Sequence, residues 1–244
     1  MSPAANGRLS FGVIGAGPVG VALAQALAGA GHLLVGISAV SAENLDRIEA
    51  MLPGAELKQV DEIIDAADLV LLAIPANQIL DLVNGAAETR LWRAGQLLAH
   101  TAGEYGYSIL SPASQQGVIA LAIHPSMRFT GTSIDLARIR ESYFAVNAPK
   151  VALPIVEALV IEMGAEPFVV AEADRAKYFE AFEVATNFSA LVVNQAIGLL
   201  EEIGLPDARA VIAPVVRSAV EQALASGHQP FNPDEITGEK NGGY

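Results

Sequence analysis

The stretch FGVIGAGPVGVALAQALAGAG, residues 11–31, decides the fold of this chain. A short apolar run of the strand type leads into the glycine-rich segment GAGPVG, and an alanine-rich helical pattern follows it directly. A strand, a glycine turn and a helix in this order can hold the pyrophosphate of a dinucleotide against the helix N-terminus. An ordinary glycine-rich turn between a strand and a helix is the alternative. The predicted cofactor-binding residues of this segment are Gly15, Ala16, Gly17, Pro18, Val19 and Gly20.

Short apolar runs alternate with helical patterns over the first 170 residues. The runs typical of strands are residues 9–14, 32–38, 69–74, 96–100, 118–123, 143–147 and 167–170. Strands that are apolar on both faces and separated by helices form a parallel sheet that is covered on both sides. The sequence therefore predicts a doubly wound α/β fold, with a mostly parallel Rossmann sheet in residues 1–170.

After residue 170 the strand-like runs end and two helical patterns follow. Residues 178–203 are expected to form one long helix that is apolar on more than one side, and a second helix should contain Pro214, which would kink it. We expect a small all-α domain over residues 171–228 that forms a homodimer through these apolar faces. Residues 229–244, rich in Gly, Asn and charge, are expected to be a mobile tail.

The composition argues against several classes of function. Of 244 residues, 52% are hydrophobic and 17% are charged, so the chain can bury a sizeable core. The net charge of −13 would repel a phosphate backbone, which argues against nucleic acid as a partner. There is no cysteine, and the four histidines lack metal-ligand spacing, so no metal is expected. No apolar stretch reaches the roughly 20 residues that span a membrane, and no secretory signal is visible, so we expect a soluble cytoplasmic protein without membrane contact.

The end of the second strand bears on the choice between NAD and NADP. NAD-binding domains usually carry an acidic residue there, which binds the ribose hydroxyls. Here no acidic residue occurs between Gly20 and Glu43, so a 2′-phosphate would not be repelled. The sequence favours NADP over NAD, with Ser38 and Ser41 as hydrogen-bond partners of the phosphate. Ser41 could also simply cap the next helix, in which Arg47 lies farther along.

Two further strand ends supply candidate cofactor contacts, because ligands bind at the carboxyl edge of a parallel sheet. Ile74 and Pro75 end one strand, where the nicotinamide side of the cofactor would pass, although a proline also simply terminates a strand. Thr101 follows the next strand and could meet the ribose or the nicotinamide amide. His100 beside it is either functional or structural.

The segment HPSMRF, residues 124–129, brings a titratable group to the same sheet edge. His124 could donate a proton to an atom that receives a hydride, or it could be a hydrogen-bonded strand-end histidine. Arg128 could bind a substrate carboxylate, or it could be a surface charge. In the expected long helix, Tyr178 is a candidate substrate-binding residue. Asn187, amid apolar neighbours, could contact substrate or cofactor, or bond to another helix.

In their order these motifs resemble the Rossmann-like proteins that carry the domain of unknown function DUF2520. The segments that carry the resemblance are GAGPVG, AIP at 73–75, HTAG at 100–103, HPSMRFTG at 124–131, and DRAKY at 174–178 with ATN nine residues later. The resemblance spans about residues 9–236. The family in turn is similar to the group of 6-phosphogluconate dehydrogenase-like proteins, pyrroline-5-carboxylate reductases and ketopantoate reductases. It implies an NADP-binding sheet domain, a dimerising helical domain and a cleft between them.

The chain departs from the family pattern at positions that bear on catalysis. Ala102 stands where the family usually has serine, and Phe179 stands where histidine is common. Glu183 occupies the position of a lysine that the related dehydrogenases use, four residues before the asparagine that matches Asn187. The first hypothesis is an NADP-dependent oxidoreductase acting on a small carbonyl or imine, with His124 and Asn187 as catalytic residues. The alternative is a non-catalytic NADP-binding sensor or scaffold that keeps the fold without turnover. A third hypothesis is a purely structural dimer whose cleft binds no nucleotide.

Overall fold

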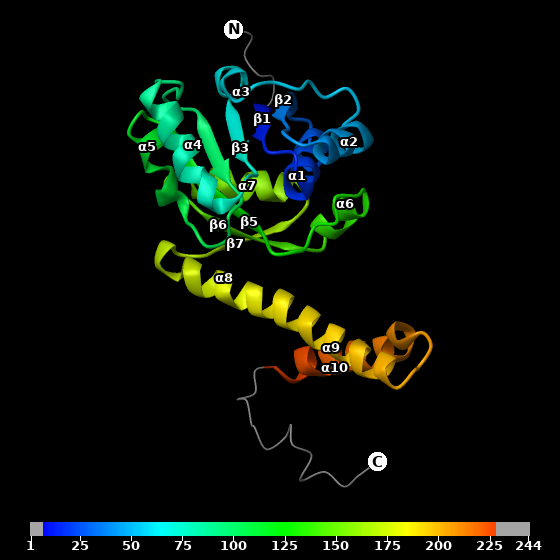
Figure 1. Ribbon diagram of the computed structural model, residues 1–244. Coiled ribbons are helices and arrows are strands. Elements are labelled where there is room, and N and C mark those ends of the chain that lie inside the picture. The colour runs from blue at the N-terminus through cyan, green and yellow to red at the C-terminus, as the bar shows by residue number, and fades with distance from the viewer. Residues whose placement is uncertain (1–6, 228–244) are drawn as a thin grey trace. The chain divides into compact units, whose positions relative to one another are not determined.

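The computed structural model describes residues 7–227 and divides the chain into two compact units, the first ending at Phe182 and the second beginning at Glu183 (Figure 1). The first unit is built on one sheet. Its strands are β1 (Ser10–Ile14), β2 (Leu33–Ser38), β3 (Leu69–Leu72), β4 (Leu97–His100), β5 (Ile119–Pro125), β6 (Tyr143–Asn147) and β7 (Glu166–Val169). They lie in the order β2-β1-β3-β4-β5-β6-β7. The predicted doubly wound Rossmann fold is therefore confirmed.

Strands β1 to β5 all run in the same direction, and the last two strands, β6 and β7, run in the opposite direction. β1 pairs in parallel with both β2 and β3, and β3, β4 and β5 pair in parallel in turn. β6 runs antiparallel to β5, and β7 is parallel to β6. The sequence did not indicate this reversal, because a strand buried on both faces has the same apolar pattern in either direction.

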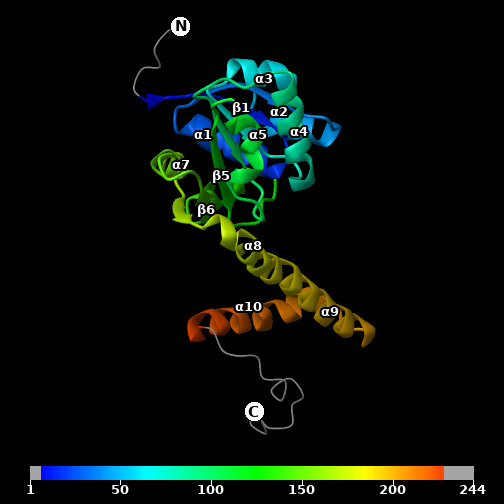
Figure 2. The same cartoon turned by 90° about the vertical axis from the view of Figure 1, so that its left-hand side faces the viewer.

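Helices cover both faces of this sheet. They are α1 (Pro18–Gly29), α2 (Ala42–Met51), α3 (Val60–Ala66), α4 (Ala76–Glu88), α5 (Ser111–Ser114), α6 (Ile134–Ile139) and α7 (Leu153–Glu162). A 3₁₀ turn, η2 (Tyr107–Leu110), precedes α5. In Figure 2 the sheet is seen between α7 on one side and α4 on the other.

The core consists of two hydrophobic clusters, one on each face of the sheet. In β3, Leu69 and Leu71 belong to the cluster that contains α1 and α7, whereas Val70 and Leu72 belong to the cluster that contains α3 and α4. Successive side chains of a strand point to opposite faces, so an uninterrupted apolar run fills both clusters at once. This is why the continuous apolar run at 69–72 forms a central strand.

The helical part of the chain begins with a 3₁₀ turn, η3 (Glu172–Asp174), and continues through α8 (Arg175–Glu183), η4 (Val184–Phe188), α9 (Ser189–Glu202) and α10 (Ala208–Ser226). The helical conformation runs without a break from Arg175 to Glu202, in line with the expected long helix over 178–203, but η4 within it is a π-helical turn that the sequence did not indicate. Within it, the Thr186 hydroxyl donates to the Glu183 carbonyl oxygen at 3.3 Å, a side-chain bond of the kind that competes with the regular helix ladder. Pro214 lies inside α10, which continues past it.

The second unit has almost no core of its own. Of its described residues, 183–227, only Ala208 is buried. Large apolar side chains are instead exposed along α9 and α10: Leu191, Val192, Leu199, Ile203, Val211, Val215, Val220 and Leu224. None of the helices within residues 7–227 is both long and apolar enough to cross a membrane. The expected mobile tail, residues 229–244, lies outside the described residues.

Candidate functional site

The glycine loop between β1 and α1 has two crowded positions and one open position. Gly15 has φ +104°, and a Cβ placed there would overlap the Ala73 carbonyl oxygen. A Cβ at Gly20 would overlap the Gly15 carbonyl oxygen. A Cβ at Gly17, by contrast, would have no atom within 4 Å. Gly15 and Gly20 are therefore needed to form the loop, whereas Gly17 leaves free space in front of it.

Helix α1 presents its N-terminus at this free space. Gly17 is the N-cap of α1 and provides no side-chain cap, and Pro18 follows it in the first turn. No acidic residue lies in that turn. The backbone N–H groups of a helix N-terminus attract an anion through their partial positive charge. The open position at Gly17 and the uncapped helix together fit a bound pyrophosphate.

The loop borders a cavity at the topological switch point of the sheet. The chain leaves β1 for β2 on one side and reaches β3 on the other, and such a point opens a crevice at the carboxyl ends of the strands. The cavity has a volume of about 410 Å³. It is lined by Ile14, Gly15, Ala16, Gly17, Ser38, Ala39, Val40, Asn44, Val60, Ala73, Ile74, Pro75, Gln78 and Leu82. Six of the predicted cofactor residues, Gly15, Ala16, Gly17, Ser38, Ile74 and Pro75, are thus brought together.

The remaining predicted cofactor residues lie outside that lining. Pro18, Val19 and Gly20 form the first turn of α1. Ser41 is the N-cap of α2, where its hydroxyl accepts a hydrogen bond from the Asn44 backbone N–H at 3.3 Å. The Thr101 hydroxyl donates to the Leu72 carbonyl oxygen at 3.4 Å.

The end of β2 is tied to the glycine loop. The Gly15 backbone N–H donates to the Ser38 hydroxyl at 3.2 Å. Arg47, whose reach the sequence left open, donates to the Ala16 carbonyl oxygen at 3.4 Å and to the Asn44 side chain at 2.5 Å. It also pairs with Glu43 at 2.7 Å. Arg47 is thus already partnered by a carboxylate.

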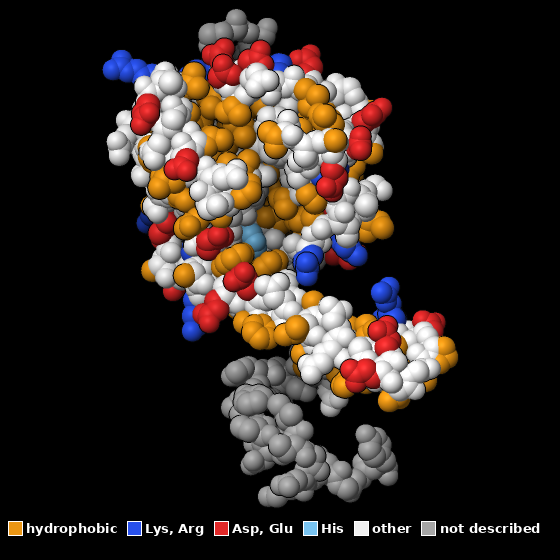
Figure 3. All heavy atoms as spheres, in the orientation of Figure 1, with side chains coloured by type: hydrophobic (Ala, Val, Ile, Leu, Met, Phe, Trp, Pro, Cys, Tyr) orange, Lys and Arg blue, Asp and Glu red, His pale blue; other side chains and the backbone are white. Residues whose placement is uncertain are grey.

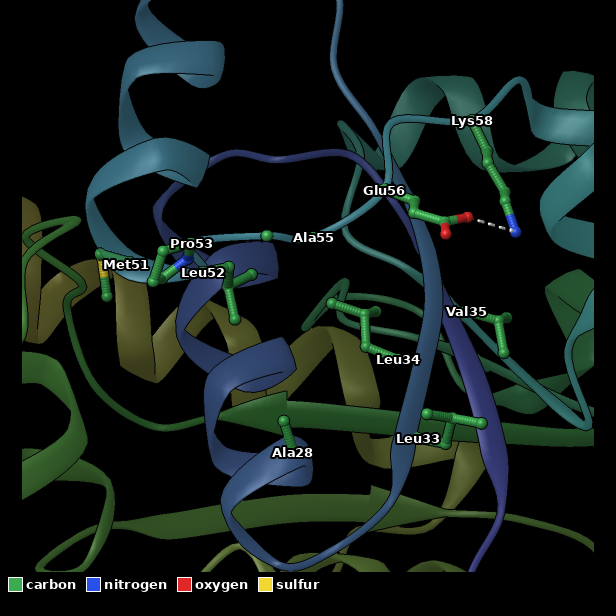
Figure 4. Close-up of a pocket in the computed structure, with 11 residues that line it drawn as sticks. Ala28, Leu33, Leu34, Val35, Met51, Leu52, Pro53, Ala55, Glu56 and Lys58 are labelled. Atoms are coloured by element: carbon green, nitrogen blue, oxygen red, sulfur yellow. Dashed lines mark ion pairs between the residues drawn. The ribbon is translucent and has the colours of Figure 1, made fainter.

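A larger cavity lies elsewhere in the first unit, at the outer side of β2 (Figure 4). Its volume is about 550 Å³, and its charged lining residues, Glu56 and Lys58, form an ion pair at 3.1 Å. Size alone does not make it the better candidate. It contains neither the glycine loop nor a histidine, and β2 contributes Leu33, Leu34 and Val35, the residues farthest from its carboxyl end.

His124 lies in β5 and is hydrogen-bonded to Tyr178 of α8. The distance between His124 Nδ1 and the Tyr178 hydroxyl oxygen is 2.6 Å, and the Ser126 hydroxyl lies 2.8 Å from the same oxygen. Phe179 and Phe182 meet the His124 ring edge-to-face, with centroids 5.8 and 5.0 Å away. The other ring nitrogen, Nε2, lies against Gly103, where a Cβ would be 2.9 Å from it.

The surroundings of His124 in this group of side chains, which we call the His124 cluster, keep its ring uncharged. The pKa of His124 is lowered to about 4, chiefly by burial among the aromatic rings and also by the charge of Arg175 and the nearby His100. Burial raises the pKa of Tyr178, while its bond to Ser126 and the charge of Arg175 act in the opposite direction. Near pH 7, therefore, the imidazole is neutral and the phenol holds its proton.

His100 is buried at the end of β4. Its Nε2 lies 2.9 Å from the Gly106 carbonyl oxygen, which fixes the ring. The pKa of His100 is lowered to about 4: burial is the main cause, the bond to Gly106 opposes the shift, and the charge of Arg175 adds to it. His100 is therefore also neutral near pH 7, with a hydrogen bond that anchors the loop after β4.

Within the described residues of the first unit, Arg128 makes no hydrogen bond or ion pair with His124 or Tyr178. Arg128 is exposed and lines a separate cavity with Arg138, Glu141 and Ser126. Asn187 is exposed and belongs to the second unit. Their assignments stay predictions. In the same described range, no group of three or more His, Asp or Glu side chains is placed to hold a metal ion.

Sequence reasoning missed two members of the cluster. Arg175 is buried beneath Tyr178, and Ser126 bonds to the Tyr178 hydroxyl. Both residues lie in segments that carry the family resemblance, HPSMRFTG and DRAKY, but the sequence did not show which partners they bind.

Figure 3 shows a hollow in the first unit with hydrophobic side chains and a histidine within it.

Comparison with known proteins agrees with this architecture. Residues 2–125 match the Rossmann-like domain, and residues 142–233 match the domain of unknown function DUF2520. No match was found among curated proteins.

Several solved structures share the fold at low sequence identity. A candidate NADP oxidoreductase from Bacteroides fragilis has a TM-score of 0.74 at 20% identity, covering 94% of this chain and 88% of that one. An imine reductase from Streptomyces aurantiacus has a TM-score of 0.66 at 22% identity, with 87% and 73% covered. The pyrroline carboxylate reductase from Plasmodium falciparum, with NADP bound, has a TM-score of 0.63 at 14% identity, with 97% and 86% covered. With the family matches, these confirm the expected resemblance: the chain belongs to the Rossmann-like domain family and carries a DUF2520 domain.

Proposed function

We propose that this protein is an oxidoreductase that moves a hydride between NADP and a small carbonyl or imine substrate. The proposal rests on one observation. The free space in front of Gly17 and the hydrogen-bonded pair His124–Tyr178 both lie at the carboxyl edge of the same sheet. That edge is where open α/β sheets bind their ligands. The similar solved structures include an imine reductase and a pyrroline carboxylate reductase, which supports this reaction class.

The residues that would hold the dinucleotide line the switch-point cavity. The backbone at Gly15–Gly17 and the α1 N-terminus would bind the pyrophosphate, and Ser38 would meet the adenosine ribose. Ile74, Pro75 and Thr101 would flank the nicotinamide. The bound cofactor would supply the hydride. NADP is preferred over NAD because no acidic side chain lines the cavity where the ribose would lie.

The proton that accompanies a hydride would come from His124 and Tyr178. With a pKa of about 4, His124 cannot act as an imidazolium near neutral pH. Its neutral ring can still give up the Nε2 proton if Nδ1 receives the Tyr178 proton in the same event, because the two groups are already hydrogen-bonded at 2.6 Å. No hydrogen bond to Nε2 is made within residues 7–227, so this nitrogen is free for substrate. Arg128 would bind an acidic group of the substrate, and Asn187 would orient it.

Cofactor binding can be tested by thermal unfolding. We expect NADPH to raise the Tm of the protein more than NADH does at equal concentration. A ligand at 100 times its Kd stabilises the folded state by about 2.7 kcal/mol, so a preference in Kd appears directly as a difference in Tm. A larger shift with NADH would reverse the cofactor preference. No shift with either nucleotide would reject the cofactor site.

A non-catalytic sensor or scaffold that binds NADP is the second candidate. Glu183 favours it, because this position carries an acid where the related dehydrogenases use a lysine. Hydride transfer should be assayed over a panel of keto acids and cyclic imines alongside NADPH binding. Tight binding without turnover on any member of the panel would favour the sensor over the enzyme.

We further propose that the second unit forms a homodimer with another copy of the chain. Its exposed apolar side chains lie on two consecutive helices and have no core of their own to fill. Leu199→Asp, at a position 57% exposed, is expected to convert dimer to monomer in light scattering after size exclusion. Ile161→Asp on α7, 61% exposed, is the matched control and should leave the mass unchanged. A monomeric wild-type chain at micromolar concentration would reject the dimer.

A further inference from the structure

Arg175 is a buried cation with unsatisfied hydrogen-bond donors. It begins α8, only 1% of the residue is exposed, and its Nη2 donates to the Ala145 carbonyl oxygen at 3.3 Å. Its Nε and Nη1 are shielded from solvent and find no acceptor in the described part of the chain. Nor does any carboxylate there form an ion pair with it. A buried, incompletely partnered charge costs stability, so its presence points to a role other than packing.

The titratable groups around Arg175 come from four places in the fold. Tyr178 lies one turn along α8, with its ring centre 6.0 Å from the guanidinium carbon. The charge of Arg175 acts on His124 of β5 and on His100 of β4, and the charge of Glu172 of η3 acts on Arg175. From β7, the Phe168 ring lies beside Tyr178, and Glu166 at the start of the strand is exposed. Arg175 is thus the cation common to both histidines and the tyrosine.

We propose that Arg175 is a positioning residue that stabilises negative charge on the Tyr178 oxygen while the Tyr178 proton passes to His124. The inference rests on the proposed function for its reaction, but the interaction itself can be measured without turnover. The guanidinium stays charged even when buried, because its intrinsic basicity is so high. It would act through Tyr178 and touch neither substrate nor cofactor.

The proton transfers balance in this scheme. When the substrate carbon gains a hydride, its oxygen or nitrogen takes the proton from His124 Nε2. At the same time Nδ1 of His124 takes the proton of the Tyr178 hydroxyl, to which it is already bonded. The imidazole remains neutral throughout, and the only new charge on the protein is the Tyr178 phenolate. Nδ1 then returns this proton to the Tyr178 oxygen, and solvent restores the proton on His124 Nε2, so both groups regain their starting forms.

The scheme also explains why a positive group lies beside two histidines. A cation favours neutral imidazole over imidazolium, and it favours phenolate over phenol. The same charge therefore keeps His124 in the form that can relay a proton and makes Tyr178 easier to deprotonate. A carboxylate at the position of Arg175 would have the opposite effect on both groups.

The test is to titrate both groups in Arg175 variants. Arg175→Met removes the charge and keeps an apolar side chain of similar length, whereas Arg175→Lys keeps the charge. The Tyr178 pKa is read from tyrosinate absorbance as the difference from the same protein with Tyr178→Phe, and the His124 pKa from ring-proton NMR. We expect both pKa values to rise by about one pH unit in Arg175→Met and to return toward wild type in Arg175→Lys. Turnover of Arg175→Met should fall roughly tenfold, in kcat rather than in the KM for cofactor.

A second variant, which should shift both pKa values in the opposite direction, tests the proposal if Arg175→Met fails to fold. Glu172→Gln removes the negative charge that faces Arg175 and should lower both pKa values. Unchanged pKa values in the folded variants would overturn the role of Arg175. If the variants shift both pKa values but the wild-type protein shows no turnover, the electrostatic role of Arg175 stands and the proposed function is rejected. Turnover that is insensitive to Arg175→Met would keep the function and reject Arg175 as its positioning residue.

Discussion

Gly17→Ala is expected to weaken dinucleotide binding about 10- to 100-fold while leaving the free energy of unfolding nearly unchanged. A methyl group at this position meets no atom of the folded chain, and the residue has φ −65°, which alanine adopts without strain. The same methyl group would occupy the space in which the pyrophosphate must approach the backbone. Inserting a methyl into an occupied site costs roughly 1–3 kcal/mol, which corresponds to this range of Kd. Calorimetric titration with NADPH and chemical unfolding measure the two quantities separately.

Gly20→Ala is the matched control for the glycine loop. Its methyl group would overlap the Gly15 carbonyl oxygen, so this variant should lose roughly 1–3 kcal/mol of stability before any ligand is added. The pair separates a glycine needed for the fold from a glycine needed for the ligand. Full-strength binding by a stable Gly17→Ala protein would show that the dinucleotide does not lie over this loop.

His124→Ala is expected to lower kcat by roughly 10²–10⁴-fold with little change in the affinity for NADPH. This range is what a positioned proton donor contributes to catalysis. His124 lies on β5, whereas the cofactor cavity is formed by the loops after β1, β2 and β3, so the two functions should separate. Tyr178→Phe should also lower kcat, because it removes the proton that refills Nδ1. Stopped-flow hydride transfer, with NADPH affinity measured on the same samples, checks both variants.

His32→Ala is the control for loss of a buried histidine. His32 is 5% exposed, bonds to Glu162 at 2.7 Å and directly precedes β2, at the sheet edge opposite the site. It should cost stability without lowering kcat in the protein that remains folded. If His124→Ala and His32→Ala lowered kcat to the same extent, the effect would be one of folding, and His124 would have no part in the chemistry.

Much of the first unit was predictable from local sequence. The apolar runs and the glycine segment each depend on neighbours within about twenty residues, so strand positions and the loop before α1 could be identified directly. The family resemblance added DUF2520, which the comparison confirms. The π-helical turn at 184–188 was missed, because a helix with one irregular turn keeps nearly the same apolar periodicity.

What the sequence by itself determined is the Rossmann fold, the position of the glycine loop, and the absence of an acidic residue at the end of β2. These follow from residue spacing and residue type, which are local properties of the chain. Only the tertiary structure decided that His124 bonds to Tyr178, 54 residues away, that Arg175 is buried beneath that tyrosine, and that β6 is antiparallel. Such pairings depend on strand register and side-chain packing between distant segments. Only there do the rings that bury His124 and the charge that lowers its pKa come together.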